Sequence, residues 1–146
     1  MIEIKKATSN DISQILPLFD DYRKFYRKEI SAEAKSFLME RISQNESVLL
    51  MALDGNKVIG FAQIYFSFSS IQLCKTAILN DLFVIPEYRR KKVATMLIDS
   101  TIENAAKLNC KSVGLSTQIS NTIAQDLYKK KGFKKDNDFF YFNFSL

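Results

Sequence analysis

The sequence predicts an α/β protein, in which a mixed central sheet of about six to seven strands is flanked by about four helices. Two observations predict this class. Apolar residues recur at helical spacing in some segments, and in the shorter segments between them they alternate with polar residues or form continuous runs. In chain order the elements read β-α-α-β-β-β-α-β-α-β, so antiparallel hairpins come first and a crossover connection follows. We expect residues 1–146 to form a single domain.

The first elements are a strand and two helices. Isoleucines alternate with charged residues at positions 2–5, which is typical of a short strand. Thr8 and Asp11 have the spacing of a capping box, and the helical stripe that follows it runs through residues 12–26. We expect Ser31 to cap the second helix.

The middle of the chain has the composition of strands. Residues 47–53 and 58–68 are expected to form a hairpin, because the Asp-Gly pair at 54–55 is a favoured turn sequence. A long third strand is expected over residues 71–85, and Pro86 ends it because proline cannot donate to a strand ladder.

The last part of the chain alternates helices with strands. A helix is expected from Val93 to about Leu108, and residues 111–116 read as a short buried strand. A further helix is expected to begin near residues 120–121 and to end at Gly132, which readily adopts the left-handed conformation of a helix terminator. Residues 139–146 alternate aromatic with polar side chains and are expected to close the sheet.

Composition excludes several functional classes. The sequence has no histidine, which excludes Ser-His and Cys-His nucleophiles. Cys74 and Cys110 lie in no motif and are expected to be reduced thiols, so we expect no metal site. No apolar run approaches the roughly 20 residues that span a bilayer and no signal peptide is evident, so we expect a cytoplasmic protein without a membrane partner. The net charge of +5 suits a polyanion or a multiply phosphorylated small molecule.

A basic cluster stands between the long strand and the helix at Val93. It consists of Arg89, Arg90, Lys91 and Lys92. The start of a helix is already positive, because its first N–H groups are unpaired and its dipole points that way. Four cations there repel that end unless an anion fills it, and a phosphate or pyrophosphate is the simplest such anion. The alternative is an ordinary exposed turn with solvated side chains.

Two motifs resemble those of the GCN5-related N-acetyltransferase (GNAT) family, and the resemblance covers essentially the whole chain. The acetyl-CoA signature of that family is Arg or Gln, two residues, Gly, one residue, then Gly or Ala. Arg89 and Ala94 match its ends, whereas Lys92 stands at the first glycine, where a lysine can still adopt a helical φ so that the loop need not be broken. The second pattern is matched at six positions, which are Asn121, Ala124, Leu127, Tyr128, Gly132 and Phe133.

The resemblance implies an acyl-CoA N-acyltransferase fold that moves an acetyl group from acetyl-CoA to a primary amine, with a small-molecule amine favoured. It places the pyrophosphate in the basic loop and the pantetheine arm along the strand at Leu82. A backbone N–H near Leu82 then polarises the thioester carbonyl. The implied coenzyme-binding residues are Leu82, Phe83, Val84, Arg89, Arg90, Lys91, Lys92, Val93, Ala94, Thr95, Asn121 and Tyr128.

Two residues are implied in catalysis. Tyr128 is the expected acid, because a phenol with a pKa near 10 is protonated at neutral pH and can donate to a thiolate. Its alternative is a place in the core with Ala124 and Leu127. Asp81 is the expected base, since Asn80 beside it cannot accept a proton and neighbouring strand residues face opposite ways. A structural Asp81, hydrogen-bonded within the sheet, remains the other interpretation.

The acceptor and the partners stay open at this point. The first two helices and the turn near Ser70 are expected to form the acceptor side, with aromatic walls from Tyr22, Tyr26, Phe66 and Phe68. A protein N-terminus or a lysine is the alternative acceptor. Two other functions compete with the enzyme, namely a non-catalytic acyl-CoA sensor and a basic nucleic-acid-binding module, although the chain has no recognised nucleic-acid motif. Dimerisation fits such a fold, but one sequence does not decide it.

Overall fold

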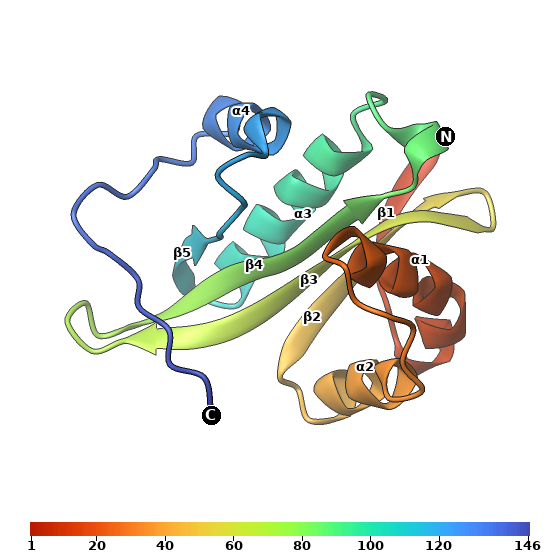
Figure 1. Ribbon diagram of the computed structural model, residues 1–146, viewed down its shortest axis with the longest axis horizontal. Coiled ribbons are helices and arrows are strands. Elements are labelled where there is room, and N and C mark those ends of the chain that lie inside the picture. The colour runs from red at the N-terminus through yellow and green to blue at the C-terminus, as the bar shows by residue number, and fades with distance from the viewer. The chain divides into compact units, whose positions relative to one another are not determined.

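A computed structural model describes residues 1–146, which divide into two compact units, 1–116 and 117–146. The first unit contains all of the strands and the first three α-helices (Figure 1). Its elements are β1 (Ile2–Lys6), α1 (Ile12–Phe25), α2 (Ala34–Ser43), β2 (Ser47–Asp54), β3 (Lys57–Ser69), β4 (Cys74–Val84), α3 (Val93–Lys107) and β5 (Cys110–Gly114). The second unit contains α4 (Thr122–Lys130).

The sheet has five strands in the order β1-β2-β3-β4-β5. The first four are antiparallel neighbours, and β5 runs parallel to β4, so the mixed α/β architecture and the predicted hairpins are confirmed. The prediction of six to seven strands is wrong. Residues 139–146 were expected to close the sheet, but they form no strand. The alternation of aromatic and polar residues would give a strand two different faces. A strand also needs the edge of another strand to pair with, and the alternation does not supply one.

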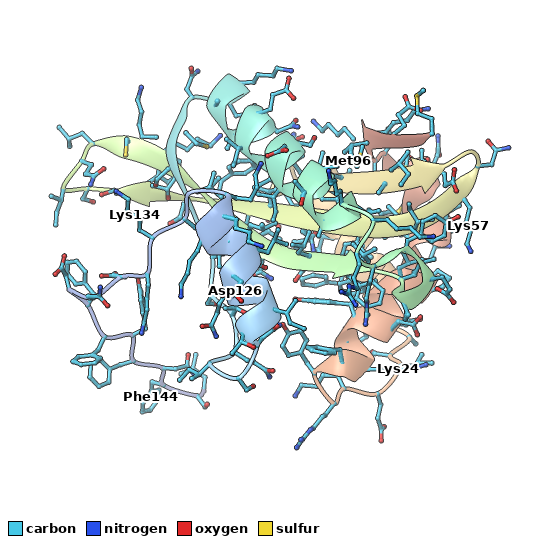
Figure 2. All side chains as sticks on the ribbon, turned by 90° about the horizontal axis from the view of Figure 1, so that it is seen from above. Lys24, Lys57, Met96, Asp126, Lys134 and Phe144 are labelled. Carbon is cyan, nitrogen blue, oxygen red and sulfur yellow. The ribbon has the colours of Figure 1, made fainter.

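Helices cover both faces of the sheet. α3 packs on one face, whereas α1 and α2 pack on the other, and Figure 2 shows the layers with Met96 marking α3 and Lys24 marking α1. Gly60 on β3 faces α3: a Cβ there would lie 2.8 Å from the carbonyl oxygen of Phe83 and 3.4 Å from Cδ1 of Leu97. The next residue, Phe61, faces α1 and contacts Phe19 at 6.0 Å between ring centroids.

Of the two helix caps predicted from the sequence, one is correct and the other is wrong. The Thr8–Asp11 capping box is present, and the Thr8 N–H donates to Oδ2 of Asp11 over 2.7 Å. Ser31 does not cap α2, because the N-cap residue is Glu33. The Ser31 hydroxyl instead accepts a hydrogen bond from the Glu33 N–H over 3.1 Å, so it shapes the turn before the helix.

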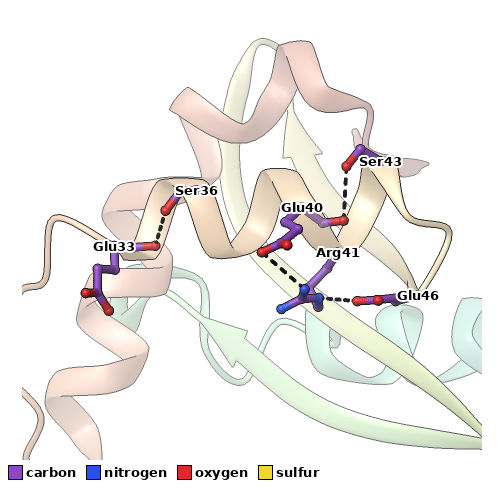
Figure 3. A network of polar contacts seen from close by, with 6 residues as sticks. All are labelled: Glu33, Ser36, Glu40, Arg41, Ser43 and Glu46. Carbon is purple, nitrogen blue, oxygen red and sulfur yellow. Dashed lines mark hydrogen bonds and ion pairs between the residues drawn. The ribbon is translucent and has the colours of Figure 1, made fainter.

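An arginine joins the end of α2 to the start of β2 (Figure 3). Arg41 pairs with Glu46 and, at 3.3 Å, with Glu40, while its guanidinium lies 4.7 Å from the ring centroid of Phe37. The Ser43 hydroxyl donates to the backbone oxygen of Glu40 over 3.1 Å. The Arg41 side chain is 20% exposed, and its ion pair with Glu46 links the last turn of α2 to the residue before β2.

The strand β5 lies at the edge of the sheet. It was expected to be buried, but Lys111 and Ser112 are exposed and β4 is its only neighbour. Its sequence combines Val113 with short polar residues, which suits a half-covered edge better than a core strand.

In the second unit, α4 begins and ends close to the predicted positions. Oδ1 of Asn121 accepts a hydrogen bond from the Ala124 N–H over 3.2 Å, so Asn121 caps α4. Gly132 follows the helix with φ of +96°. The ring of Tyr128 meets that of Phe133 edge to face, with 5.9 Å between their centroids. No helix of the chain has both the length and the apolar content that crossing a membrane requires.

Candidate functional site

The open side of β4 is the first component of the site. β5 pairs with β4 only at Lys75, Ala77 and Ile78. On its other side β4 stays paired with β3 as far as Val84. The stretch from Leu79 to Val84 therefore has no strand partner on the side of β5. This stretch contains Leu82, Phe83 and Val84, the residues predicted to carry the coenzyme arm.

The loop after β4 has an unusual backbone. Arg90 and Lys92 both have positive φ, of 62° and 65°, whereas Lys91 between them does not. Alternating left- and right-handed residues turn successive N–H groups toward one point, which makes an anion-binding concavity. The N–H groups of residues 90–95 donate no backbone hydrogen bond to the rest of the protein. This backbone can therefore hold an anion at the start of α3.

Lys92 does not adopt the right-handed helical φ that is open to a lysine. Lys92 is the N-cap residue of α3 and adopts the left-handed conformation, with φ of 65° and ψ of 11°. Glycine takes this conformation without penalty, whereas a residue with a Cβ pays about 1–2 kcal/mol. The family signature has glycine at this position, so the chain keeps the backbone geometry of the loop with a lysine in place of the glycine.

Two side chains attach the loop to the sheet. Nε of Arg89 donates to the backbone oxygen of Val84 over 2.9 Å, and its guanidinium lies 5.7 Å from the ring centroid of Phe83. The Tyr88 hydroxyl donates to Oδ2 of Asp54 over 2.7 Å, and this hydrogen bond raises the pKa of Tyr88. Arg89 therefore acts as a brace within the loop, with its guanidinium turned toward the sheet.

The other three cations are exposed at the same helix start. They are Arg90, Lys91 and Lys92. No acidic residue lies in the first turn of α3. Lys91 lies 4.8 Å from the ring centroid of Tyr88, and Lys57 approaches the same ring at 5.5 Å. The positive end of the helix dipole and the three cations thus favour a ligand with several negative charges.

Asp81 is the centre of a buried polar network on the face of the sheet that α1 covers. Its side chain is 5% exposed. Nε2 of Gln63 donates to its Oδ2 over 2.7 Å, and Nδ2 of Asn80 donates to its Oδ1 over 2.9 Å. Burial raises the pKa of Asp81, and the hydrogen bonds from Gln63, Asn80 and Tyr22 oppose that rise. The carboxyl is therefore a stronger proton acceptor, once ionised, than an exposed aspartate.

A β-bulge shapes this network. Gln63 on β3 is opposite Asp81, but the next residue, Ile64, is opposite Leu79, so Asn80 is an extra residue on β4. Bulges interrupt the regular alternation of side chains and are frequent next to active sites. Here the amide of Asn80 reaches the carboxylate of its own neighbour, and its backbone oxygen accepts a hydrogen bond from the Tyr22 hydroxyl over 3.3 Å.

Aromatic rings surround the network. Tyr22 contacts Phe61 and Phe83 edge to face, at 5.7 Å and 6.3 Å between centroids, and Tyr26 at 5.2 Å. Burial and then the charge of Asp81 raise the pKa of Tyr22 strongly, and the same two causes raise that of Tyr65 to about 12. Both phenols therefore remain protonated and can act as hydrogen-bond donors at neutral pH.

The predicted site residues fall into two groups. The first unit brings together Asp81, Leu82, Phe83, Val84 and the loop 89–95. The second unit contains Asn121 and Tyr128, whose roles remain predictions. Sequence reasoning missed Gln63 and Tyr65 as neighbours of Asp81. A signal was available for Gln63, because it is the only amide side chain within the apolar strand β3.

Comparison with known proteins identifies the family. The family model described as "Acetyltransferase (GNAT) family" matches residues 15–133. An uncharacterized N-acetyltransferase YhfO of Bacillus subtilis is 36% identical over 142 residues, which cover 97% of this chain and 95% of that protein. The chain therefore belongs to the GNAT family, and the prediction that it is an acetyltransferase is confirmed.

Solved structures agree with this assignment. The crystal structure of a probable acetyltransferase has 34% sequence identity and a TM-score of 0.92, with coverage of 99% of this chain and 97% of that one. A predicted acetyltransferase from Clostridium acetobutylicum, whose crystal structure was determined with acetyl-CoA, is 20% identical with a TM-score of 0.80, covering 98% and 96%. At that identity the likeness shows the fold alone. Neither the sensor nor the nucleic-acid-binding alternative gains support from these comparisons.

Proposed function

We propose that this acetyltransferase binds acetyl-CoA along the open side of β4 and transfers the acetyl group to the primary amine of a small molecule. One observation carries the proposal. The stretch of β4 that lacks a partner leads within a few residues into the anion-binding loop at the start of α3. A ligand with amide groups at one end and a diphosphate at the other matches both features in the same order.

The pantetheine arm contains two amides, so it can pair with the free backbone of β4 as an added strand would. Leu82, Phe83 and Val84 lie in that free stretch. A backbone N–H near Leu82 would then donate to the thioester oxygen. Negative charge develops on this oxygen when an amine attacks, and a fixed donor that stabilises it is commonly worth a factor of 10² or more in rate.

The loop would hold the diphosphate. Support comes from the N–H groups of residues 90–95, which donate to no backbone acceptor, and from the three exposed cations beside them. Val93, Ala94 and Thr95 contribute through their backbone at the first turn of α3. Lys92 has the backbone conformation that the glycine of the signature would have, so its ammonium can be added to the site without altering the loop.

Asp81 would accept a proton from the amine. The amine nitrogen forms a bond with the acetyl carbon, the C–S bond breaks, and its electron pair goes to the sulfur. The nitrogen passes its proton to Asp81 through water, because the carboxyl is 5% exposed. We assign to Tyr128 the proton that the departing thiolate takes up, and to Asn121 the capping of the helix that carries Tyr128. Proton exchange with solvent then restores both groups.

A small-molecule acceptor is supported by one relative and by the site. The thialysine N-epsilon-acetyltransferase of Bos taurus is 33% identical over 78 residues, which cover 53% of this chain and 45% of that protein. In this chain, Tyr22 and Tyr26 bring aromatic rings next to the Asp81 network. Aromatic faces attract a cationic amine by about 0.5–2 kcal/mol.

An amine panel that measures release of free thiol from acetyl-CoA tests this function. The panel contains lysine analogues, polyamines and aminoglycosides, together with peptides that offer only an N-terminal amine. We expect turnover of at least one small amine, and a loss of turnover in Asp81→Asn. Turnover of peptides alone would contradict the acceptor class. Binding of acetyl-CoA with no thiol release from any amine would instead favour the sensor.

A further inference from the structure

A row of polar side chains crosses the face of the sheet that α1 and α2 cover. Gln63 and Tyr65 are alternate residues of β3, so they lie on the same face as Phe61, which contacts α1. Ser47 on β2 is opposite Tyr65. Asp81 on β4 is opposite Gln63. Because directly opposite residues share a face, the row continues from Asp81 across β3 to Ser47.

Two members of the row have a buried polar atom without a hydrogen-bond partner. These atoms are Oε1 of Gln63 and Oγ of Ser47, and the two residues are 0% and 8% exposed. Buried polar atoms are rarely left unpaired, and each exception calls for an explanation such as a bound molecule. The row therefore has hydrogen-bonding capacity that a polar ligand can use at both of its ends.

Tyr65 lies between these two atoms and is half-buried. Side-chain rotamer changes are common on binding, so a shift of its ring can open the row to a ligand. Burial and then the charge of Asp81 raise the pKa of the Tyr65 phenol. Arg41 lowers that pKa, and Glu46 raises it. The phenol is therefore within electrostatic range of both ends of the row.

The end of the row at Ser47 has an excess of negative charge. Glu46 directly precedes Ser47 in the chain. Arg41 pairs with Glu46 and also with Glu40 (Figure 3). Neither carboxylate pairs with a second cation, so two negative charges meet one positive charge. An added cation is therefore attracted to this end of the row, whereas an added carboxylate is repelled.

We propose that the acceptor is a linear diamine whose second ammonium group binds at Ser47 and Glu46 while its first amine meets Asp81. This inference rests on the proposed function, because it places the reacting amine at Asp81. An ammonium only donates hydrogen bonds, so Oγ of Ser47 and the carboxylate of Glu46 suit it. Oε1 of Gln63 accepts a hydrogen bond from the first amine. The Cα atoms of Asp81 and Ser47 are about 12 Å apart, two strand spacings and two residues of rise, and the methylene chain bridges them.

Three amines of similar chain length test the second ammonium site. Cadaverine has an ammonium at its far end, pentylamine has a methyl group there, and aminocaproate has a carboxylate. Calorimetry on the full chain, with and without CoA, measures binding, so the result does not depend on turnover. We expect cadaverine to bind at least about tenfold more tightly than pentylamine, and aminocaproate to bind more weakly than pentylamine. Equal affinities, a preference for aminocaproate, or no detectable binding of cadaverine would each overturn the proposal.

Ser47→Ala tests where the second ammonium binds. The Ser47 hydroxyl has no partner within the chain, so its removal breaks no internal hydrogen bond. We expect the advantage of cadaverine over pentylamine to fall by about fivefold or more. Ser36→Ala, at an exposed hydroxyl on α2, is the matched control and should keep the advantage. An undiminished advantage in Ser47→Ala would reject the site.

Thiol release from acetyl-CoA separates this inference from the function on which it rests. An equal kcat/KM for cadaverine and pentylamine would leave the acetylation of small amines in place and reject the diamine. Tight binding of cadaverine, without thiol release from any amine, would instead reject the proposed reaction and support the diamine site.

Discussion

The amide of Gln63 and the carboxylate of Asp81 meet across β3 and β4, where Nε2 donates to Oδ2 over 2.7 Å. Both side chains are buried. The hydrogen bond stabilises the ionised carboxyl and so opposes the effect of burial on the pKa of Asp81. This pair therefore lowers the pH at which the proposed base becomes available, against the larger effect of burial.

Gln63→Leu should raise the pKa of Asp81 further, because it removes the donor that favours the carboxylate. A base must be ionised to act, so the acidic limb of the kcat/KM profile should move to higher pH. Gln14→Leu, a change at an exposed position on α1, is the matched control and should leave the limb in place. An unchanged limb in Gln63→Leu would mean that Asp81 is not the base.

The raised pKa of Asp81 also makes a prediction for stability. A carboxyl whose folded-state pKa exceeds its unfolded value of 3.8 binds more protons when folded, so its contribution to stability falls as the pH rises from about 3.8 through the folded-state pKa. Asp81→Asn removes this term. The free energy of unfolding of Asp81→Asn, compared with that of the unmodified protein at the same pH, should therefore increase as the pH rises across that window.

Urea unfolding at a series of pH values measures this difference. Asp126→Asn, at an exposed carboxyl on α4, provides the control and should give a difference that does not vary in the same direction. A relative stability of Asp81→Asn that worsens steadily with pH would contradict the raised pKa.

Lys92→Gly should stabilise the protein by about 1 kcal/mol, because glycine adopts the left-handed conformation without the Cβ penalty. Coenzyme binding should persist although the ammonium is lost, since the N–H groups of the loop keep their arrangement. Lys92→Ala removes the same charge but keeps the strain of the left-handed backbone. Comparing the two variants therefore separates the effect of the backbone conformation from the effect of the charge. Calorimetry with CoA and thermal unfolding provide the measurements, and loss of binding in Lys92→Gly would refute the proposed role of the loop.

Arg90→Gln should weaken binding of CoA by about fivefold at low salt and by less at high salt, because the proposed contact is a partly screened charge interaction. Pantetheine lacks the diphosphate, so its affinity should not change. Lys134→Gln alters an exposed cation in the second unit and is the matched control. An equal loss of affinity for pantetheine would show that Arg90 supports the fold of the loop instead of contacting phosphate.

Tyr128→Phe should lower kcat by about 10²-fold if the phenol protonates the departing thiolate. The substitution keeps the ring that meets Phe133 at 5.9 Å, so thermal stability and the affinity for CoA should stay nearly constant. Tyr141→Phe removes an exposed hydroxyl and serves as the control. Full turnover in Tyr128→Phe would assign this residue to packing alone.

Local patterns in the sequence predicted most helices and strands correctly, but they failed at particular positions. The hairpin at Asp54 and the start of α4 near Asn121 depend on a few neighbouring residues, and both were predicted correctly. The left-handed conformation of Lys92 depends on the path of the whole loop, which overrides the preference of lysine. The failure at residues 139–146 has another cause, because forming a strand requires an edge to pair with.

Family resemblance located Asp81 but gave none of its surroundings. The bulge at Asn80 arises from the register between β3 and β4, a non-local property that no window of sequence contains. Gln63 lies 18 residues before Asp81 and meets it only through that register. The environment that sets the pKa of the proposed base therefore could not be predicted from the sequence alone.

The position of Asp81 next to Leu82, within the stretch of β4 that has no partner on the side of β5, has a mechanical consequence. Both residues belong to one strand that β3 holds along its length. A motion that shifted the proposed thioester position would shift the carboxyl with it. The spacing between the proposed base and the proposed backbone donor at Leu82 is therefore set by the covalent geometry of one strand.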